Sequence, residues 1–293
     1  MKVADLMKIS VITPSYNQGQ FILRTLQSVA TQSGASFEHV VFDGGSTDQT
    51  VEVLKSFAAP LRWVSKKDGG QADAVNQGIL STDGEIIAWL NSDDIYYPGA
   101  FKKVLEVFQK NPDIDVVYGD ADHIDILDVP FEEYPTEAWN FDRLFETCFI
   151  CQPALFFRRS LVERYGLLDV SLNYCMDYEY WLRLAAGGAK FLHIPMKLAG
   201  SRLYADNKTL GARVKVHREI NDMFKKKFGK VPDRWLFNYA TVCTESQISR
   251  GKFPKLFLGV FAIRSLKNSL YWNGFISSSM IKIMKEWIFG RRN

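Results

Sequence analysis

Residues 85–98 have the sequence EIIAWLNSDDIYYP, in which a short apolar run ends abruptly in polar side chains. The run from Ile86 to Leu90 follows a turn signal at residues 82–84, which is typical of a strand buried on both faces of a sheet. An amide, a hydroxyl and two carboxylates follow it: Asn91, Ser92, Asp93 and Asp94. In an open α/β sheet, ligands bind at the carboxyl ends of the strands. These four side chains are therefore candidates for a binding site.

Oxygen ligands favour a hard cation such as Mg²⁺ or Mn²⁺, which takes one or two carboxylates and completes its shell with water and substrate phosphates. A simpler interpretation is that the acidic residues cap the next helix, which we expect to begin near Pro98. This stretch alone leaves both interpretations open. Two adjacent carboxylates repel each other, however, and a cap needs only one.

The chain has 293 residues, of which 47% are hydrophobic, so it is long enough to bury a large core. Its formal net charge of +3 is small, and basic residues do not cluster with aromatic ones, so we expect no nucleic-acid partner. The first eight residues lack the apolar core of a signal peptide, and no apolar stretch approaches the ~18 residues that span a bilayer. We therefore expect a cytoplasmic protein, or one on the inner face of the membrane.

Four cysteines without an export signal indicate reduced thiols. Cys148 and Cys151 form an isolated C-x-x-C pair with no second pair and no nearby histidine, so a zinc or redox site is poorly supported. Their apolar neighbours favour a buried strand at this position instead.

Strands and helices alternate along the first part of the chain. Strands are expected at residues 8–16, 38–42, 61–65 and 86–90, with helices at 20–31, at 72–80 and up to residue 57, where Ser46 and Gln49 predict a capping box. This alternation predicts an α/β fold with a mostly parallel, Rossmann-like sheet flanked by helices.

Each of these four strands ends in a polar loop, and in a parallel sheet such loops gather at one edge. Every loop alone could be an ordinary turn, but their recurrence favours a nucleotide-binding crevice. The glycine spacing gives neither the dinucleotide fingerprint G-x-G-x-x-G nor the P-loop G-x-x-x-x-G-K-[ST]. The sequence therefore lacks the clearest motifs of enzymes that transfer hydride or hydrolyse ATP.

Four motifs occur in order: TPSYN at 13–17, DGGSTD at 43–48, DGGQ at 68–71 with NQG at 76–78, and NSDD at 91–94. Together they resemble the motifs of family 2 glycosyltransferases with the GT-A fold, over roughly residues 8–208. The resemblance implies an enzyme of polysaccharide or glycan biosynthesis. Such an enzyme moves a sugar from a nucleoside-diphosphate sugar, here a UDP-sugar, to a hydroxyl of a glycan or lipid-linked acceptor and inverts the anomeric carbon.

The resemblance also implies roles for single residues. Asp93 is expected to bind the metal ion directly, and Asp94 is expected to lie behind Asp93. The first acid of the family's D-x-D motif is here Asn91, an amide that is expected to contact the ribose. The side chains expected to bind the donor are Thr13, Ser15, Tyr16, Asp43, Asp68, Gln71, Asn91 and Ser92. Asp43 would accept the imino N–H of the base, and Gln71 would lie near the sugar or phosphate.

The catalytic base implied by the resemblance is Asp177. The family's motif is Glu-Asp at this position, and Met176 replaces the Glu here. Helical spacing places Asp177 on one face with Tyr180 and Trp181, at the start of a helix. An acid that merely complements the helix dipole is the other interpretation.

Arg202 is expected to bind the donor phosphates, because the family's Arg-x-His element becomes Arg202-Leu-Tyr204 here. Lys208 is a weaker candidate for the same role. Asp120 and Asp122 follow a strand expected at 115–118, where they face either the acceptor or solvent.

The expected organisation is a GT-A domain at residues 1–228 and a helical extension at 229–293. In the extension, apolar and basic residues recur at helical spacing, including Leu256, Phe261, Trp287, Lys255 and Arg291. This pattern fits helices that lie in a membrane interface and equally fits helices that pack on the catalytic domain.

Two other functions stay open. A nucleotidyltransferase would normally carry a basic residue in the loop after its first strand, and residues 13–20 contain none. A scaffold that binds nucleotide sugars without turnover is suggested by Asn91 and Met176. The enzyme hypothesis requires Asp93 and Asp177 to lie on either side of one sugar.

Overall fold

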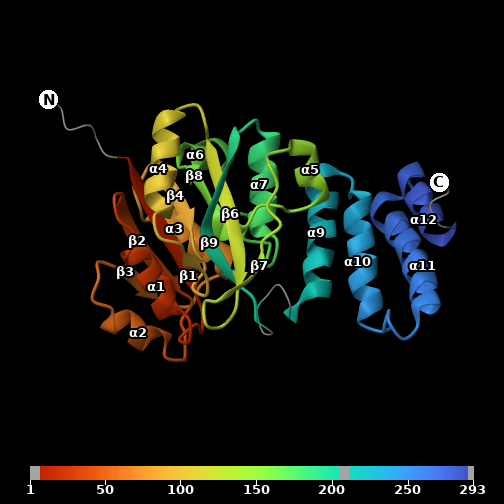
Figure 1. The fold of residues 1–293 in the computed structure, drawn as a ribbon, viewed down its shortest axis with the longest axis horizontal. Helices are drawn as coiled ribbons and strands as arrows, with labels where there is room; N and C mark the ends of the chain where they lie inside the picture. Colours follow the sequence, from red (N-terminus) through yellow and green to blue (C-terminus); the bar gives the residue numbers. More distant parts are fainter. Residues whose placement is uncertain (1–6, 205–206, 208–210, 290–293) are drawn as a thin grey trace. The chain divides into compact units, whose positions relative to one another are not determined.

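This computed structural model describes residues 7–204, 207 and 211–289. Its contacts divide the chain into two compact units, one of residues 1–141 and 148–204, the other of residues 142–147 and 205–293 (Figure 1). Lys208 and Arg291, which were singled out from the sequence, lie outside the described residues.

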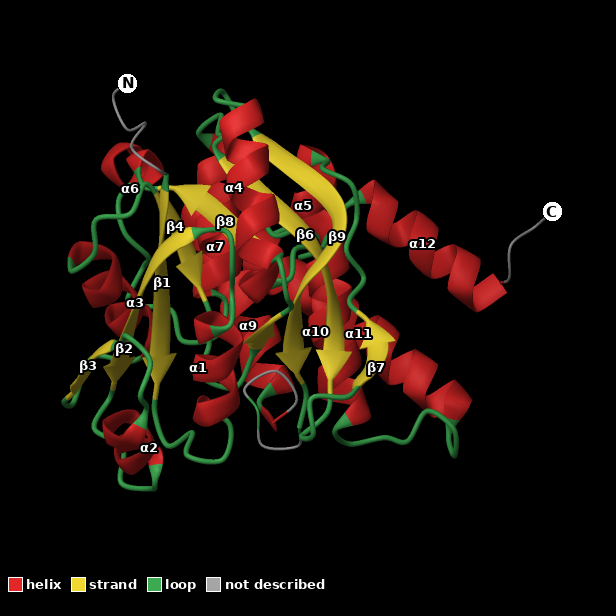
Figure 2. Cartoon of the chain, turned by 60° about the vertical axis from the view of Figure 1, so that its left-hand side comes forward, coloured by secondary structure: helices red, strands yellow, loops and turns green. Residues whose placement is uncertain are grey.

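The first unit is built on a sheet in the order β3-β2-β1-β4-β8-β6-β9-β5, with β7 beside β6 (Figure 2). β1 to β4 are parallel, as predicted, and β9 is parallel to β6. β8 lies antiparallel between β4 and β6, which the sequence pattern did not predict. The strands are β1 (Lys8–Ser15), β2 (Ser36–Asp43), β3 (Arg62–Ser65), β4 (Ile86–Trp89), β5 (Ile95–Tyr96), β6 (Val116–Ile124), β7 (Pro130–Glu133), β8 (Leu155–Arg158) and β9 (Phe191–Arg202).

Helices cover both faces of this sheet. Successive side chains of a strand point to opposite faces. On β8, Phe156 contacts Phe101 of α4, whereas Phe157 contacts Tyr180 of α7. The helices of this unit are α1 (Ile22–Ala30), α2 (Thr50–Ser56), α3 (Gln71–Leu80), α4 (Ala100–Lys110), α6 (Ser160–Tyr165) and α7 (Met176–Ala186), with the 3-10 turn η1 (Gln152–Ala154) before β8. The α/β fold with flanking helices is therefore confirmed.

The close approach of α3 to β1 depends on a glycine. A Cβ atom at Gly78 would lie 2.3 Å from Cγ2 of Ile12, well inside van der Waals contact. Only a residue without a side chain allows this helix to sit directly on the sheet. The loop that precedes α3 is thereby held against the carboxyl edge of the strands.

Three local predictions were wrong. α2 has no Ser46 capping box, because Asp48 accepts the N–H of Thr50 at 2.9 Å while the Ser46 hydroxyl donates to Asp43. Cys148 and Cys151 lie in a loop, not in a strand, and both are free thiols.

The third concerns only the end of the strand expected at 115–118. A strand is present there, but β6 begins at Val116 and continues to Ile124, so that it carries Asp120 and Asp122. Asp120 lies 2.8 Å from His193 Nε2, and Asp122 accepts hydrogen bonds from Tyr97 at 2.9 Å and pairs with Lys197 at 2.7 Å. Both acids therefore bind other side chains of the protein, whereas the sequence had left them facing either the acceptor or solvent.

The second unit consists of α5 (Phe141–Glu146), α9 (Arg213–Phe228), α10 (Asp233–Glu245), α11 (Pro254–Asn273) and α12 (Ser278–Phe289). α10 contacts both α9 and α11, and the indole N–H of Trp235 donates to the carbonyl of Phe145 at 3.0 Å. α9 thus packs with the C-terminal helices. The boundary expected after residue 228 would instead assign α9 to the GT-A domain, and this boundary stays a prediction. None of the helices in the described part of the chain is long and apolar enough to cross a bilayer.

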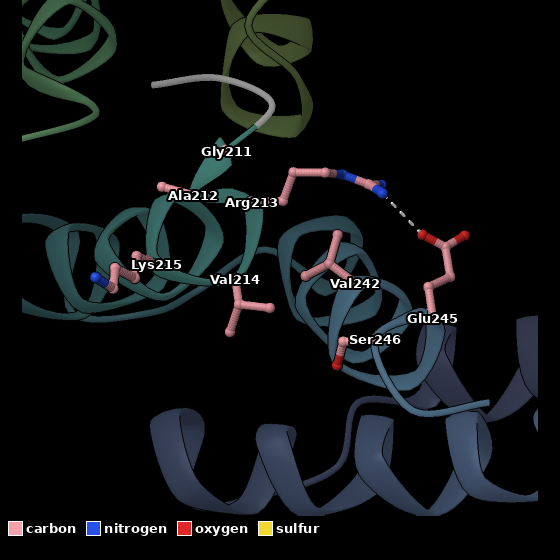
Figure 3. A pocket seen from close by; sticks show the side chains of 8 residues that line it. All are labelled: Gly211, Ala212, Arg213, Val214, Lys215, Val242, Glu245 and Ser246. Atoms are coloured by element: carbon pink, nitrogen blue, oxygen red, sulfur yellow. Dashed lines mark ion pairs between the residues drawn. The ribbon is translucent and has the colours of Figure 1, made fainter. Parts of the chain in front are cut away.

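A cavity of about 370 Å³ lies between the start of α9 and the end of α10 (Figure 3). An ion pair of 3.1 Å joins Arg213 to Glu245 at its rim. Its lining residues are Gly211, Ala212, Arg213, Val214, Lys215, Val242, Glu245 and Ser246. None of the candidate donor-binding or catalytic residues belongs to this cavity.

Candidate active site

The loops after β1, β2 and β3 contact one another at the carboxyl edge of the sheet. Gly44 donates its N–H to the carbonyl of Ser15 at 2.8 Å, which joins the first two loops. A Cβ atom at Gly44 would lie 3.2 Å from the carboxylate of Asp68, so the third loop is equally close. The structure therefore brings together the first three motifs singled out from the sequence.

Asp43 orders this region. Its carboxylate is only 2% exposed and accepts the N–H groups of Gly45 and Ser46 at 3.2 and 2.9 Å. It also accepts the hydroxyls of Ser46 and Ser65, the latter at 2.6 Å. Four protein donors thus already surround the group that was expected to meet the base.

Thr13, Ser15 and Tyr16 differ in their surroundings. The Thr13 hydroxyl is buried and lies 2.9 Å from Nε2 of His39, so its side chain faces the interior of the unit. Tyr16 is exposed. The Ser15 hydroxyl is buried at the end of β1, and within the described residues it has no hydrogen-bond partner.

Burial lowers the pKa of His39 from 6.5 to about 3. In the unfolded chain the His39 imidazole therefore takes up a proton near pH 6.5. In the folded protein the same imidazole stays neutral down to about pH 3. Stability is lost as the pH falls through this window, by about 2 kcal/mol at pH 5. We expect His39→Gln to flatten the dependence of unfolding free energy on pH between 7 and 5, measured by urea denaturation. Thr13→Val is the matched control, because it removes the hydroxyl partner but keeps the buried imidazole and its pH dependence.

Asn91 is the centre of a hydrogen-bond network after β4. Its Oδ1 accepts hydrogen bonds from Gln71 Nε2 at 2.7 Å and from Trp89 Nε1 at 2.9 Å. Its Nδ2 donates to Gln152 Oε1 at 2.9 Å and to Asp94 Oδ2 at 3.2 Å. These four bonds use both lone pairs and both hydrogens of the amide. Asn91 therefore joins the third and fourth loops to η1 and has no bonding capacity left for a ribose hydroxyl in this arrangement.

Asp93 and Asp94 have different environments. Asp94 is buried, and its Oδ1 accepts the backbone N–H of Arg202 at 2.8 Å. Burial, followed by the adjacent charge of Asp93, raises the pKa of Asp94 well above its usual range. Asp93 is half-buried, and its Oδ2 accepts the phenolic O–H of Tyr204 at 3.0 Å. Asp93 is thus the more accessible carboxylate of the pair.

The backbone of this loop is fixed from two sides. The Thr25 hydroxyl of α1 lies 3.0 Å from the carbonyl of Ser92 and 2.8 Å from that of Asp94. The side chain of Ser92 is buried, so this residue contributes to the loop mainly through its backbone. The Thr25 hydroxyl therefore joins α1 to the backbone of this loop.

Arg202 supports the same loop from β9. Its side chain is 0% exposed, and its Nε donates to the carbonyl of Asp93 at 2.6 Å. The two terminal nitrogens donate to the carbonyl of Asp125 and to the carboxylate of Asp128. The guanidinium thus faces protein groups rather than an open crevice, which does not favour the expected direct contact with a phosphate.

Asp177 lies in the first turn of α7, as its position in the sequence predicted. Burial raises the pKa of Cys148, and the charge of Asp177 raises it further. For Cys151, burial is again the largest cause, and the charges of Asp94 and of Asp177 both contribute. The carboxylates of Asp94 and Asp177 therefore lie within electrostatic range of one thiol.

The donor set around Asp93 fits a cation that takes few protein ligands. In the part of the chain that the structure describes, no three His, Cys, Asp or Glu side chains are grouped to hold a metal. Mg²⁺ and related hard cations are commonly bound by one or two carboxylates together with substrate phosphates and water. Asp93 supplies the accessible carboxylate, and the adjacent Asp94 is buried.

Three residues of this site were not assigned a direct role from the sequence. Tyr204 contacts Asp93, Gln152 holds Asn91 and the carbonyl of Trp89, and Thr25 fixes the loop backbone. Tyr204 had been noticed only as a replacement for histidine. Gln152 and Thr25 carry no local signal, because their partners are more than 60 residues away along the chain.

Solved structures share this fold. S. aureus TarS in complex with UDP-GlcNAc superposes with a TM-score of 0.61 over 88% of this chain and 82% of that one, at 15% identity. The mannosyltransferase PcManGT from Pyrobaculum calidifontis, in complex with GDP-Man and Mn²⁺, gives 0.59 over 96% and 79%, at 16% identity. The fold is therefore that of GT-A glycosyltransferases.

Sequence comparison gives the family. Residues 10–166, more than half of the chain, match the model of glycosyl transferase family 2, and the chain belongs to this family. An uncharacterized glycosyltransferase of Rickettsia typhi is 28% identical over 69% of this chain and 62% of its own length. A PGL/p-HBAD biosynthesis glycosyltransferase of Mycobacterium tuberculosis is 29% identical over 63% and 73%. The chain spans about three fifths of the length of the first two rickettsial relatives.

Proposed function

We propose that this glycosyltransferase transfers a hexose-type sugar from a UDP-sugar to a hydroxyl group, with inversion at the anomeric carbon. The observation that carries the proposal is that the loops after β1, β2 and β3 meet at the carboxyl edge of the sheet, where Gln71 joins them to the loop of Asp93. We assign the other side of the sugar to Asp177, in the first turn of α7. Together Asp93 and Asp177 provide one carboxylate for a leaving diphosphate and another for an attacking hydroxyl.

In this proposal the three joined loops surround the base and ribose of the donor. Asp43 and Asp68 border the base, and the accessible Tyr16 and the unpaired Ser15 hydroxyl lie at the same edge of the sheet. The bound UDP-GlcNAc of TarS supports a nucleotide-sugar donor, and the bound GDP-Man of PcManGT shows that nucleotides other than UDP occur on this fold. Gln71 extends from the start of α3 to Asn91, which supports our proposal that it lies between the base and the metal loop.

We propose Asp93 as the protein ligand of Mg²⁺ or Mn²⁺, consistent with the Mn²⁺ in PcManGT. When bound, the cation would offset the charge of the departing diphosphate. Arg202 and Tyr204 then act by holding Asp93, the first through its carbonyl and the second through its carboxylate. We therefore propose a positioning role for Arg202 in place of direct phosphate binding.

Asp177 completes the reaction as general base. It takes the proton of the acceptor hydroxyl while the oxygen attacks the anomeric carbon on the face opposite the leaving group. The buried rings of Tyr180 and Trp181 on the same helix fix the position of α7 against the sheet. The acceptor, a glycan or a lipid-linked saccharide, would enter on the Asp177 side.

The alternative function is a scaffold that binds a nucleotide sugar without turnover. Asn91 and Met176 suggested it, but both have structural roles here. Asn91 makes four hydrogen bonds, and the apolar Met176 is buried at the start of α7. Neither substitution leaves an unsatisfied or misplaced group that would indicate a decayed site.

Thermal shift with nucleotide sugars and Mn²⁺ tests donor and metal binding together. A donor at about 100 times its Kd stabilises the folded state by about 2.7 kcal/mol, and we expect this stabilisation to shrink strongly when EDTA replaces Mn²⁺. Asp93→Asn should behave in Mn²⁺ as the wild type does in EDTA. Asp113→Asn, which changes an exposed acid that pairs with Lys190, is the matched control. Equal donor affinity with and without Mn²⁺ would contradict the metal assignment, and binding without turnover would favour the scaffold.

A further inference from the structure

Positive charge is concentrated in the C-terminal part of the chain. Residues 205–293 contain 18 basic and 6 acidic residues, a formal net charge of +12, whereas the whole chain has +3. The α11 segment, residues 254–273, contains no acidic residue at all. A charge of this size and sign on one unit favours contact with an anionic surface.

α11 carries apolar side chains on both of its faces. The inner face packs within the helical unit, where Phe257, Phe261 and Trp272 are buried. On the outer face Leu256, Ile263 and Leu270 recur every seven residues and are 56%, 56% and 52% exposed. A surface helix of a soluble protein normally has a polar outer face. Packing within the helical unit therefore does not explain why the outer face of α11 carries apolar side chains.

Aromatic and basic side chains border this outer face. Phe253 precedes the helix, and Tyr271 and Phe275 lie at its end, all of them exposed. Lys255 and Lys267 are exposed on the helix itself. Exposed apolar residues flanked by aromatic rings and lysines are the pattern of a helix that lies in a membrane interface.

We propose that the α11 outer face, defined by Leu256, Ile263, Lys267 and Leu270, binds an anionic lipid surface. The apolar side chains would enter the boundary between head groups and acyl chains, and the lysines would contact the lipid phosphates. α11 lies flat rather than crossing, because no described helix is long and apolar enough to span a bilayer. A second copy of this chain is a poorer partner for this face, because two copies of a segment with a net charge of +12 repel each other.

Co-sedimentation of the full chain with vesicles tests the proposal without any donor or metal. We expect binding to phosphatidylcholine vesicles that contain a third of phosphatidylglycerol, weak binding to phosphatidylcholine alone, and a decrease with added salt. Ile263→Glu combined with Leu270→Glu should lower the partition coefficient at least about tenfold. Replacing Lys255 and Lys267 with glutamine should lower it by about fivefold each.

The matched control is Leu80→Glu combined with Leu127→Glu. Both leucines are 71% exposed and belong to the first unit, so this variant should bind vesicles as the wild type does. Circular dichroism melting shows whether each variant is folded. Equal binding of the α11 variant and the wild type, or no preference for phosphatidylglycerol, overturns the proposal. A wild-type dimer without vesicles that Ile263→Glu makes monomeric would overturn it as well, since the face would then join two copies.

Discussion

Asp177→Asn is expected to lower kcat for sugar transfer by about 10² to 10⁴-fold while the affinity for the donor stays the same. Asparagine has nearly the same shape as aspartate but cannot take the proton of the acceptor hydroxyl. The donor contacts lie on the loops after β1 to β4, so they do not depend on this proton transfer. Steady-state kinetics with a radiolabelled or chromophoric acceptor, together with donor titration by calorimetry, separates the two effects.

Glu52→Gln is the matched control for this substitution. Glu52 is also an acid in the first turn of a helix, α2, and is exposed. If Asp177 serves only to complement the helix dipole, both variants should lose a little stability and keep their activity. An Asp177→Asn enzyme with wild-type kcat would therefore refute the general-base assignment.

Arg202→Gln is expected to destabilise the protein by about 3 to 5 kcal/mol, because it removes one partner of a buried charged network. Asp128 would lose its main counter-charge, and the carbonyls of Asp93 and Asp125 would lose their donors. The metal loop should loosen as a result, so donor affinity in Mn²⁺ should fall together with stability. Urea denaturation measures the first effect and donor titration the second.

Arg24→Gln is the matched control for Arg202→Gln, because it separates the effect of burial on stability from the effect of the charge. Arg24 also pairs with Asp128, at 3.2 Å, but its side chain is 30% exposed. A pair in contact with solvent typically contributes about 1 kcal/mol or less. A loss for Arg202→Gln no larger than that for Arg24→Gln would contradict the positioning role.

Local patterns were enough to predict the first half of the sheet. The run at 86–90 is a buried strand, and the polar loops after β1 to β4 do meet at one edge, because parallel strands with helical crossovers leave few other arrangements. The antiparallel strand β8 could not be foreseen, since its apolar sequence is the same whichever direction it runs. Asp120 and Asp122 were expected to face either the acceptor or solvent, and their contacts could not be foreseen because their partners His193 and Lys197 lie on β9.

The sequence predicts candidate site residues but not the contacts that they make. Asp93 and Asp177 stood out because their motifs resemble those of a known family. That Arg202 is buried against Asp93, 109 residues away, follows only from the antiparallel pairing of β9 with β5, the strand directly after Asp93 and Asp94. The same holds for Gln152 and Asn91, which are 61 residues apart. Long-range contacts of this kind decide whether a polar side chain faces a ligand or another part of the chain.

The full use of the Asn91 amide limits how this sequence could change over evolutionary time. An aspartate at position 91 would leave Gln152 without its donor and add a second negative charge next to the buried Asp94. Replacing Asn91 with the aspartate that is usual in this motif is therefore not expected to be neutral. A change of Asn91 to an acid would require compensating changes at Gln152 and at the other hydrogen-bond partners of this amide.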